Sequence, residues 1–149
     1  MKIWLDGDAC PTAIKTILFR AVIRTHTTLY IVANHFPSAP PSPFIKKIQV
    51  PMGFDAADNQ IIERMAPGDL VITADIPLAD AVVFKGGKAL NPRGELYCPK
   101  NIKQHLATRN LNESLRSSGM IRGGQATMSQ KEVQQFANHL DRFLRQGGI

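Results

Sequence analysis

Aspartates follow two apolar segments in the first half of the chain, and a proline comes two to five residues after the strand-terminal acid in each case. Apolar runs of this kind are typical of strands buried on both faces, and proline suits the first turn of a helix. Each segment therefore predicts a strand, an acid and the start of a helix. In open α/β sheets, ligands bind at this edge, beyond the carboxyl ends of the strands. The segments are Ile3–Leu5, followed by Asp6 and Asp8, and Leu70–Ala74, followed by Asp75.

Further acids lie in the predicted helices. Asp55 and Asp58 occupy the cap and third positions of a helix, where carboxylates accept hydrogen bonds from free backbone amides, so capping alone can explain both. They also share one helix face, as a common ligand site requires. Asp80 lies in the first turns of the helix that follows Asp75.

Convergence of these acids would require a cation, because crowded carboxylates repel one another. Oxygen ligands favour Mg²⁺ or Mn²⁺. Two such ions about 4 Å apart promote the attack of water on a phosphodiester. The candidate metal ligands are Asp6, Asp8, Asp58, Asp75 and Asp80.

Charge is distributed unevenly along the chain, whose formal net charge is +6. Residues 1–80 contain 7 Lys/Arg and 8 Asp/Glu, whereas residues 81–149 contain 11 and 4. An acidic half and a basic half suit an anionic substrate that is brought to a metal, although a basic surface that only interacts with water explains the same numbers. The candidate phosphate and nucleic-acid contacts are Lys85, Lys88, Arg93, Arg116 and Arg122.

The length of 149 residues predicts a single domain, 1–149, with a helical C-terminal part from about residue 101. We expect a cytoplasmic protein without membrane association, because no run approaches the roughly 20 apolar residues of a membrane span and the start lacks the apolar segment of a secretory signal. Cys10 and Cys98 form no metal-binding or disulfide pattern. The sequence leaves open whether the protein forms a homodimer.

Hydrophobic periodicity predicts an α/β protein in which a mostly parallel central sheet is flanked by helices. A strand, a helix and a second strand at the observed spacing imply a right-handed parallel crossover. The proline-rich residues 36–44 form either a rigid surface connection or a loop over the active edge. Strands are predicted at 3–5, 28–33, 45–50, 70–75, 88–90 and 95–97, and helices at about 11–25, 55–65, 78–84 and 101–118 and after a capping box at 129–132.

Four segments together resemble the bacterial YaiI/YqxD family, and the resemblance covers nearly the whole chain. That family is grouped with PIN-like domains, many of which are Mg²⁺- or Mn²⁺-dependent ribonucleases. The resemblance implies a three-layer PIN-like (Rossmann-like) fold and an RNA substrate. It makes Asp6 and Asp75 the acids that end strands, Asp58 the helical acid and Asp80 the acid just beyond. The four segments are Ile3–Pro11, Gly53–Asn59, Val71–Ala79 and Leu90–Gly94.

Two other functions remain open at this point. The order Asp6-Gly7-Asp8 also resembles haloacid-dehalogenase-like phosphatases, in which the first aspartate is phosphorylated and the second is the acid and base. Against this alternative, Cys10 replaces the expected threonine and the chain has no room for a cap domain. The third alternative is a metal-stabilised RNA-binding module without catalysis, in which the five basic residues contact phosphates.

Overall fold

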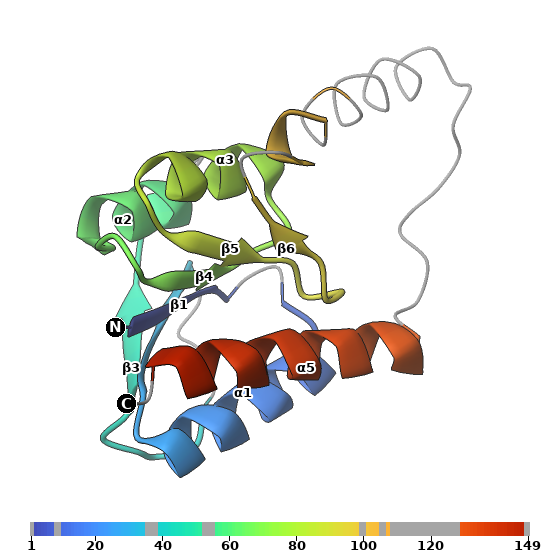
Figure 1. The fold of residues 1–149 in the computed structure, drawn as a ribbon. Helices are drawn as coiled ribbons and strands as arrows, with labels where there is room; N and C mark the ends of the chain where they lie inside the picture. The colour runs from blue at the N-terminus through green and yellow to red at the C-terminus, as the bar shows by residue number, and fades with distance from the viewer. Residues whose placement is uncertain are drawn as a thin grey trace, which may run out of the picture.

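Six strands form one sheet in the order β3-β2-β1-β4-β5-β6 in the computed structural model (Figure 1). The first five strands are parallel, and β6 pairs with β5 in the antiparallel direction. The structure describes residues 2–7, 10–34, 39–51, 56–98, 101–104, 107 and 129–147. The strands are β1 (Lys2–Asp6), β2 (Thr28–Ala33), β3 (Ile45–Gln49), β4 (Leu70–Ile72), β5 (Lys88–Leu90) and β6 (Leu96–Tyr97).

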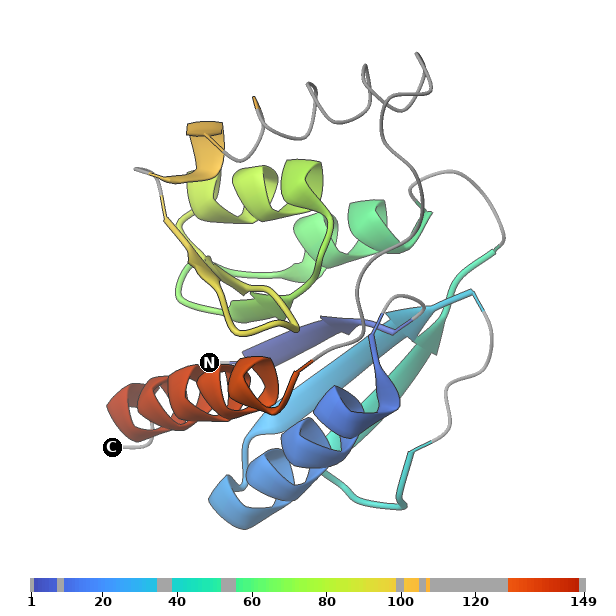
Figure 2. The same cartoon turned by 90° about the vertical axis from the view of Figure 1, so that its right-hand side faces the viewer.

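Helices cover both faces of the sheet, which confirms the predicted three-layer α/β architecture (Figures 1 and 2). Alternate residues of β1 point to opposite faces, so Ile3 and Leu5 join the core beneath α1 and α5, whereas Trp4 joins the core beneath α2 and α3. The helices are α1 (Thr12–Thr25), α2 (Ala56–Arg64), α3 (Ile76–Phe84) and α5 (Gln130–Gly147).

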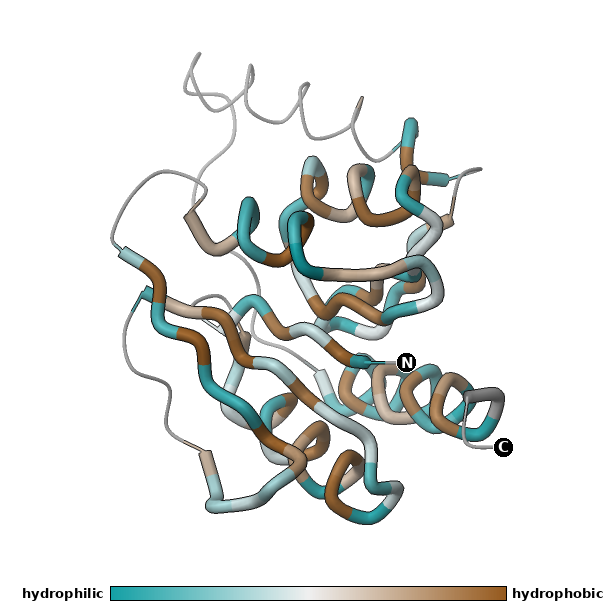
Figure 3. The backbone as a smooth tube through the Cα atoms, turned by 90° about the vertical axis from the view of Figure 1, so that its left-hand side faces the viewer, coloured by the Kyte–Doolittle hydropathy of each residue, from teal (hydrophilic) through white to brown (hydrophobic). Residues whose placement is uncertain are grey.

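The central strands are apolar along their length, and the helices are apolar on one side, as the hydropathy colouring in Figure 3 shows. In β1, Leu5 lies beside Ile31 of β2 and Ile72 of β4. The five parallel strands therefore end at the same edge of the sheet. We call this edge the acid edge and define it by Asp6, Thr73, Asp75 and Asn91, and we call the opposite edge the amino edge.

The strand β4 is shorter than predicted. It ends at Ile72, although Thr73 N still donates a hydrogen bond to Leu90 O at 3.1 Å. Asp75 is the N-cap of α3 and not the last residue of the strand, and α3 begins at Ile76. The prediction was wrong here because the cap needs its own extended backbone, with φ −81° and ψ 114°, outside both strand and helix.

The predicted C-terminal elements agree with the structure where it is described. The Ser129–Glu132 capping box is confirmed, because Ser129 N donates to Glu132 Oε1 at 3.1 Å and Glu132 N donates to Ser129 Oγ at 3.2 Å. Residues 101–104 and 107 are helical. The predicted cap Asp55, most of the helix at 101–118 and the loop at 118–127 lie outside the described residues.

A buried carboxylate holds the amino edge together. Asp69, which is 4% exposed, accepts hydrogen bonds from the indole Nε1 of Trp4 and from the backbone amides of Lys2 and Ala66, each at 3.0 Å. These bonds join the start of β1 to the turn before β4. The sequence analysis assigned no role to Asp69, and the structure reveals this one.

Among the described helices, none combines the length and the apolar composition that crossing a bilayer requires.

Candidate functional site

Thr73 connects two of the predicted acids at the acid edge. Its hydroxyl lies 3.5 Å from Asp6 Oδ2, to which it can donate, and it accepts a hydrogen bond from Asp75 N at 3.0 Å. Thr73 itself is only 1% exposed, and Asp6 and Asp75 are both half-buried. The ends of β1 and β4 thus bring the Asp6 carboxylate and the backbone amide of Asp75 to the same hydroxyl.

The two carboxylate oxygens of Asp75 have different roles. Its Oδ1 accepts the backbone N–H of Leu78 at 2.9 Å and so caps α3, whose N-terminus favours negative charge. Within the described part of the chain, Asp75 Oδ2 accepts no hydrogen bond. The carboxylate is therefore held in position while one of its oxygens is available to a ligand.

The turn after Asp6 is packed closely against β2. Gly7 N donates to Val32 O at 2.9 Å, and a Cβ at Gly7 would lie only 2.8 Å from Ile31 Cγ2. A side chain at position 7 would push the turn away from β2. Glycine therefore lets the chain leave β1 while Asp6 stays at the strand end.

Asp58 and Asp80 have different placements. Asp58 lies in the first turn of α2, on the same side as Ile61, which is buried beneath that helix. Asp80 lies about 150° around α3 from the buried side formed by Leu78 and Ala79. The helices thus turn Asp58 toward the sheet and Asp80 away from it.

The predicted metal site is only partly visible. Asp8 lies outside the described residues, as do Arg116 and Arg122. In the described ranges, no group of three or more His, Cys, Asp and Glu residues is arranged to hold a metal ion. Asp6 and Asp75, which Thr73 links, carry carboxylate oxygens of the kind that suits Mg²⁺ or Mn²⁺. Mg²⁺ commonly binds through one or two carboxylates together with waters and substrate phosphates.

Two of the predicted phosphate contacts lie at the amino edge. Lys88 is paired with Leu70 at the start of β4, and its Nζ lies 5.6 Å from the centre of the Phe143 ring. Lys85 donates from Nζ to Ile62 O at 2.6 Å and so binds a carbonyl near the end of α2. This placement separates both lysines from the acids, because α3 runs from its N-cap Asp75 to Phe84, just before Lys85, and β5 runs from Lys88 toward Asn91.

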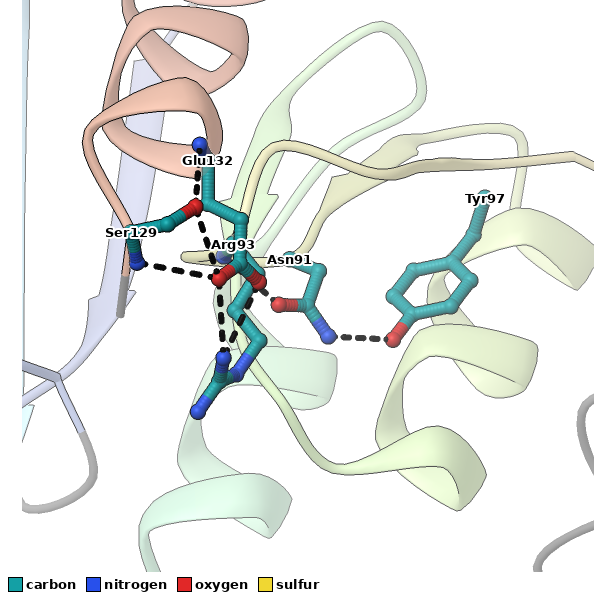
Figure 4. A network of polar contacts seen from close by, with 5 residues as sticks. All are labelled: Asn91, Arg93, Tyr97, Ser129 and Glu132. Carbon is teal, nitrogen blue, oxygen red and sulfur yellow. Dashed lines mark hydrogen bonds and ion pairs between the residues drawn. The ribbon is translucent and has the colours of Figure 1, made fainter. Parts of the chain in front are cut away.

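Arg93 lies at the acid edge and forms an ion pair with α5 (Figure 4). Its Nη1 lies 3.1 and 2.9 Å from the two carboxylate oxygens of Glu132. The amide of Ser129 and then Arg93 lower the pKa of Glu132 below its ordinary value. Arg93 therefore joins the turn after β5 to the first turn of α5, and its predicted contact with phosphate stays a prediction.

Asn91 continues this network toward the acids. Its Oδ1 accepts Arg93 N at 2.7 Å, and its Nδ2 donates to the Tyr97 hydroxyl at 2.7 Å (Figure 4). Burial raises the pKa of Tyr97, the bond from Asn91 opposes the rise, and the nearby charges of Glu95 and Asp75 add to it. The Asp75 carboxylate is thus close enough to Tyr97 to influence the charge of its ring hydroxyl.

Sequence reasoning missed Thr73, Asn91 and Tyr97 as members of this edge. Thr73 was assigned only to the apolar segment Leu70–Ala74, and Asn91 only to the segment Leu90–Gly94. A polar residue directly after each of two neighbouring strands was the available signal. Tyr97 gave none, because its place depends on the antiparallel return of β6.

Cys10 is a half-buried thiol beside the acid edge. Burial raises its pKa to about 12, Lys15 lowers it, and Asp6 raises it further. In metal-free protein we expect stability to fall as pH rises from 9.0 toward about 12, because the folded state binds the thiol proton more tightly. At pH 8 the thiolate fraction would be about 1,000-fold below that of an ordinary cysteine.

The rate of alkylation by iodoacetamide measures the thiolate fraction of Cys10. In the Cys98→Ala variant, only Cys10 can react, and we expect native protein to react roughly 1,000-fold more slowly than the same protein in urea. Equal rates in the two conditions would contradict the raised pKa.

Comparison with known proteins places the chain in a family. The family described as "Uncharacterized BCR, YaiI/YqxD family" matches residues 4–146. A UPF0178 protein of Shewanella amazonensis is 57% identical over 144 residues, which cover 97% of each chain. A UPF0178 protein of Pectobacterium carotovorum is 53% identical over 146 residues, which cover 98% of this chain and 97% of the relative.

Among solved structures, Rae1 (YacP) from Bacillus subtilis is similar with a TM-score of 0.45 and 16% identity, over 95% of this chain and 99% of that chain. The sequence relatives are far more similar, and they match along almost the full length. The chain therefore belongs to the YaiI/YqxD family.

Proposed function

We propose that this protein is a metal-dependent ribonuclease whose divalent cation, Mg²⁺ or Mn²⁺, is held by Asp6 and Asp75 at the acid edge. The observation that carries the proposal is the link through Thr73, whose hydroxyl contacts the Asp6 carboxylate at the end of β1 and the backbone amide of Asp75 at the start of α3. Asp58, turned toward the sheet at the same edge, and Asp8 are the further acids of the proposed site. The family resemblance seen in the sequence supports the same function.

The chain's own residues would position the reacting groups. Asp75 would present Oδ2 to the cation while Oδ1 stays bonded to Leu78 N. Asp6 would approach from β1, with Thr73 restricting the direction of its carboxylate. When bound, the cation would supply charge stabilisation of the phosphodiester and lower the pKa of a water that attacks it.

Removal and return of metal test this proposal. Purified protein treated with EDTA is expected to leave labelled single-stranded and structured RNA intact, and added Mg²⁺ or Mn²⁺ is expected to start cleavage. Circular dichroism in EDTA checks that the fold is unchanged. Cleavage that continues in EDTA would contradict the proposal.

The same preparation separates the alternatives. Incorporation of fluoroberyllate at Asp6, without RNA cleavage, would favour a phosphatase that uses Asp6 as a nucleophile. RNA binding without any cleavage in Mg²⁺ or Mn²⁺ would favour a non-catalytic RNA-binding module.

A further inference from the structure

A groove runs between α1 and α5 on the sheet face opposite α2 and α3. The two helices lie side by side in both views (Figures 1 and 2) and enclose a groove of about 320 Å³. Its floor includes Ala21 and Ala137, whose short side chains leave the space between the helices unfilled. Large apolar residues such as Leu18 and Phe136 lie below it in the core.

Cations and amides form the walls of the groove. Arg20 and Arg24 are one turn apart on α1, and Gln134 and Asn138 are one turn apart on α5. The four side chains are exposed. The groove therefore offers guanidinium and amide donors above a small apolar floor, which are the groups that contact phosphate, sugar and base.

One carboxylate holds these cations in place but does not neutralise all of their positive charge. Asp141 Oδ1 lies 3.3 Å from Arg24 Nη2, and its Oδ2 lies 3.0 Å from Arg145 Nη2. Arg20 has no ion-pair partner in the described part of the chain. Two guanidinium groups thus share the Asp141 carboxylate, and each bonded arginine keeps most of its five donors for a ligand.

The groove is aligned with the acid edge. Because α1 follows the carboxyl end of β1 and the first turn of α5 is bound to Arg93, both helices begin there. On α1 the groove extends from Ile17 to Arg24, about 8 to 18 Å along the helix from Thr12. A chain held in the groove would therefore point toward Asp6.

We infer that this groove binds the backbone of single-stranded RNA and guides it to the acid edge. The inference rests on the proposed function, because it names a path for the same substrate. A polyanion matches the excess of arginine, whereas an apolar partner helix would bury the charge of Arg20, which has no ion-pair partner among the residues that the structure describes.

Binding measured without cleavage tests this inference. Fluorescence anisotropy of a labelled single-stranded RNA in EDTA gives the association constant at several salt concentrations. For Arg20→Ala/Arg24→Ala we expect the slope of log K against log salt to become shallower by about 1.4, and K at 0.1 M salt to fall roughly 25-fold. The matched control is Lys46→Ala/Lys103→Ala, which removes the same charge from other exposed positions and is expected to change the slope little.

A variant that is expected to bind RNA more tightly gives a result that misfolding cannot produce. Asp141→Asn removes the carboxylate from between the arginines, and we expect its association constant to exceed that of the wild type. Unchanged binding in both the arginine and the Asp141 variants would overturn the inference, as would an equal loss in the lysine control. A wild-type dimer that the arginine variant converts to a monomer, without loss of RNA binding, would show that a second copy occupies the groove and would also overturn it.

The outcome is separable from that of the proposed function. If the wild type cleaves RNA but the arginine variant binds it normally, the groove inference fails and the nuclease stands. If binding depends on the arginines but no metal starts cleavage, the nuclease fails and the groove stands.

Discussion

Asp75→Asn and Asp6→Asn are each expected to lower the rate of the proposed metal-dependent RNA cleavage by about 1,000-fold or more, equivalent to about 4 kcal/mol of transition-state stabilisation. The reason is that an amide cannot replace the charge of a carboxylate that binds the cation. Initial rates of cleavage of a labelled RNA at saturating Mn²⁺ measure the loss.

Stability measurements distinguish this loss from misfolding. Asparagine is a good N-cap, so Asp75→Asn is expected to unfold within about 0.5 kcal/mol of the wild type, whereas Asp75→Ala should lose about 1 kcal/mol with the cap. Glu63→Gln, an exposed change on α2, is the matched control and should keep full activity. Full activity in either aspartate variant would contradict the proposed site. Asp80→Asn, measured in the same way, tests Asp80, the fourth of the predicted acids, which α3 turns away from the sheet.

Asp69→Ala is expected to cost about 3 kcal/mol of the free energy of unfolding, because it leaves the buried indole N–H of Trp4 and two backbone amides without their acceptor. Urea unfolding followed by tryptophan fluorescence measures this, since Trp4 is the only tryptophan in the chain.

Glu63→Ala serves as the control for Asp69→Ala and should change the free energy of unfolding by less than about 0.5 kcal/mol. An unchanged urea midpoint for Asp69→Ala would show that water replaces the carboxylate without cost. Activity per folded molecule should be unaffected, because Asp69 lies at the amino edge.

Local signals in the sequence predicted the elements of the fold well. The apolar run of β1 and the Ser129–Glu132 capping box each depend on residues close together in the chain, and both are present in the structure. The approach of Asp6 and Asp75 was also predictable, because parallel strands end at one edge. Their connection through Thr73 was not, since it depends on the register of β1 against β4.

Contacts between distant parts of the chain were not predictable from the residue types alone. Arg93 was identified as a cation, but its pairing with Glu132, 39 residues later, depends on where α5 packs. Lys85 was identified as a candidate phosphate contact because of its charge, and the length of α3 places it at the amino edge. Asp69 looked like one acid of a surface turn, and only the packed position of Trp4 reveals its role.

The two ends of β1 have different roles. Its first amide is fixed by Asp69, and its last residue is Asp6, about 13 Å away along the strand. Groups this far apart contribute to folding free energy almost independently. Selection can therefore remodel the reactive end of the sheet, even to a new ligand, while the opposite end continues to supply stability.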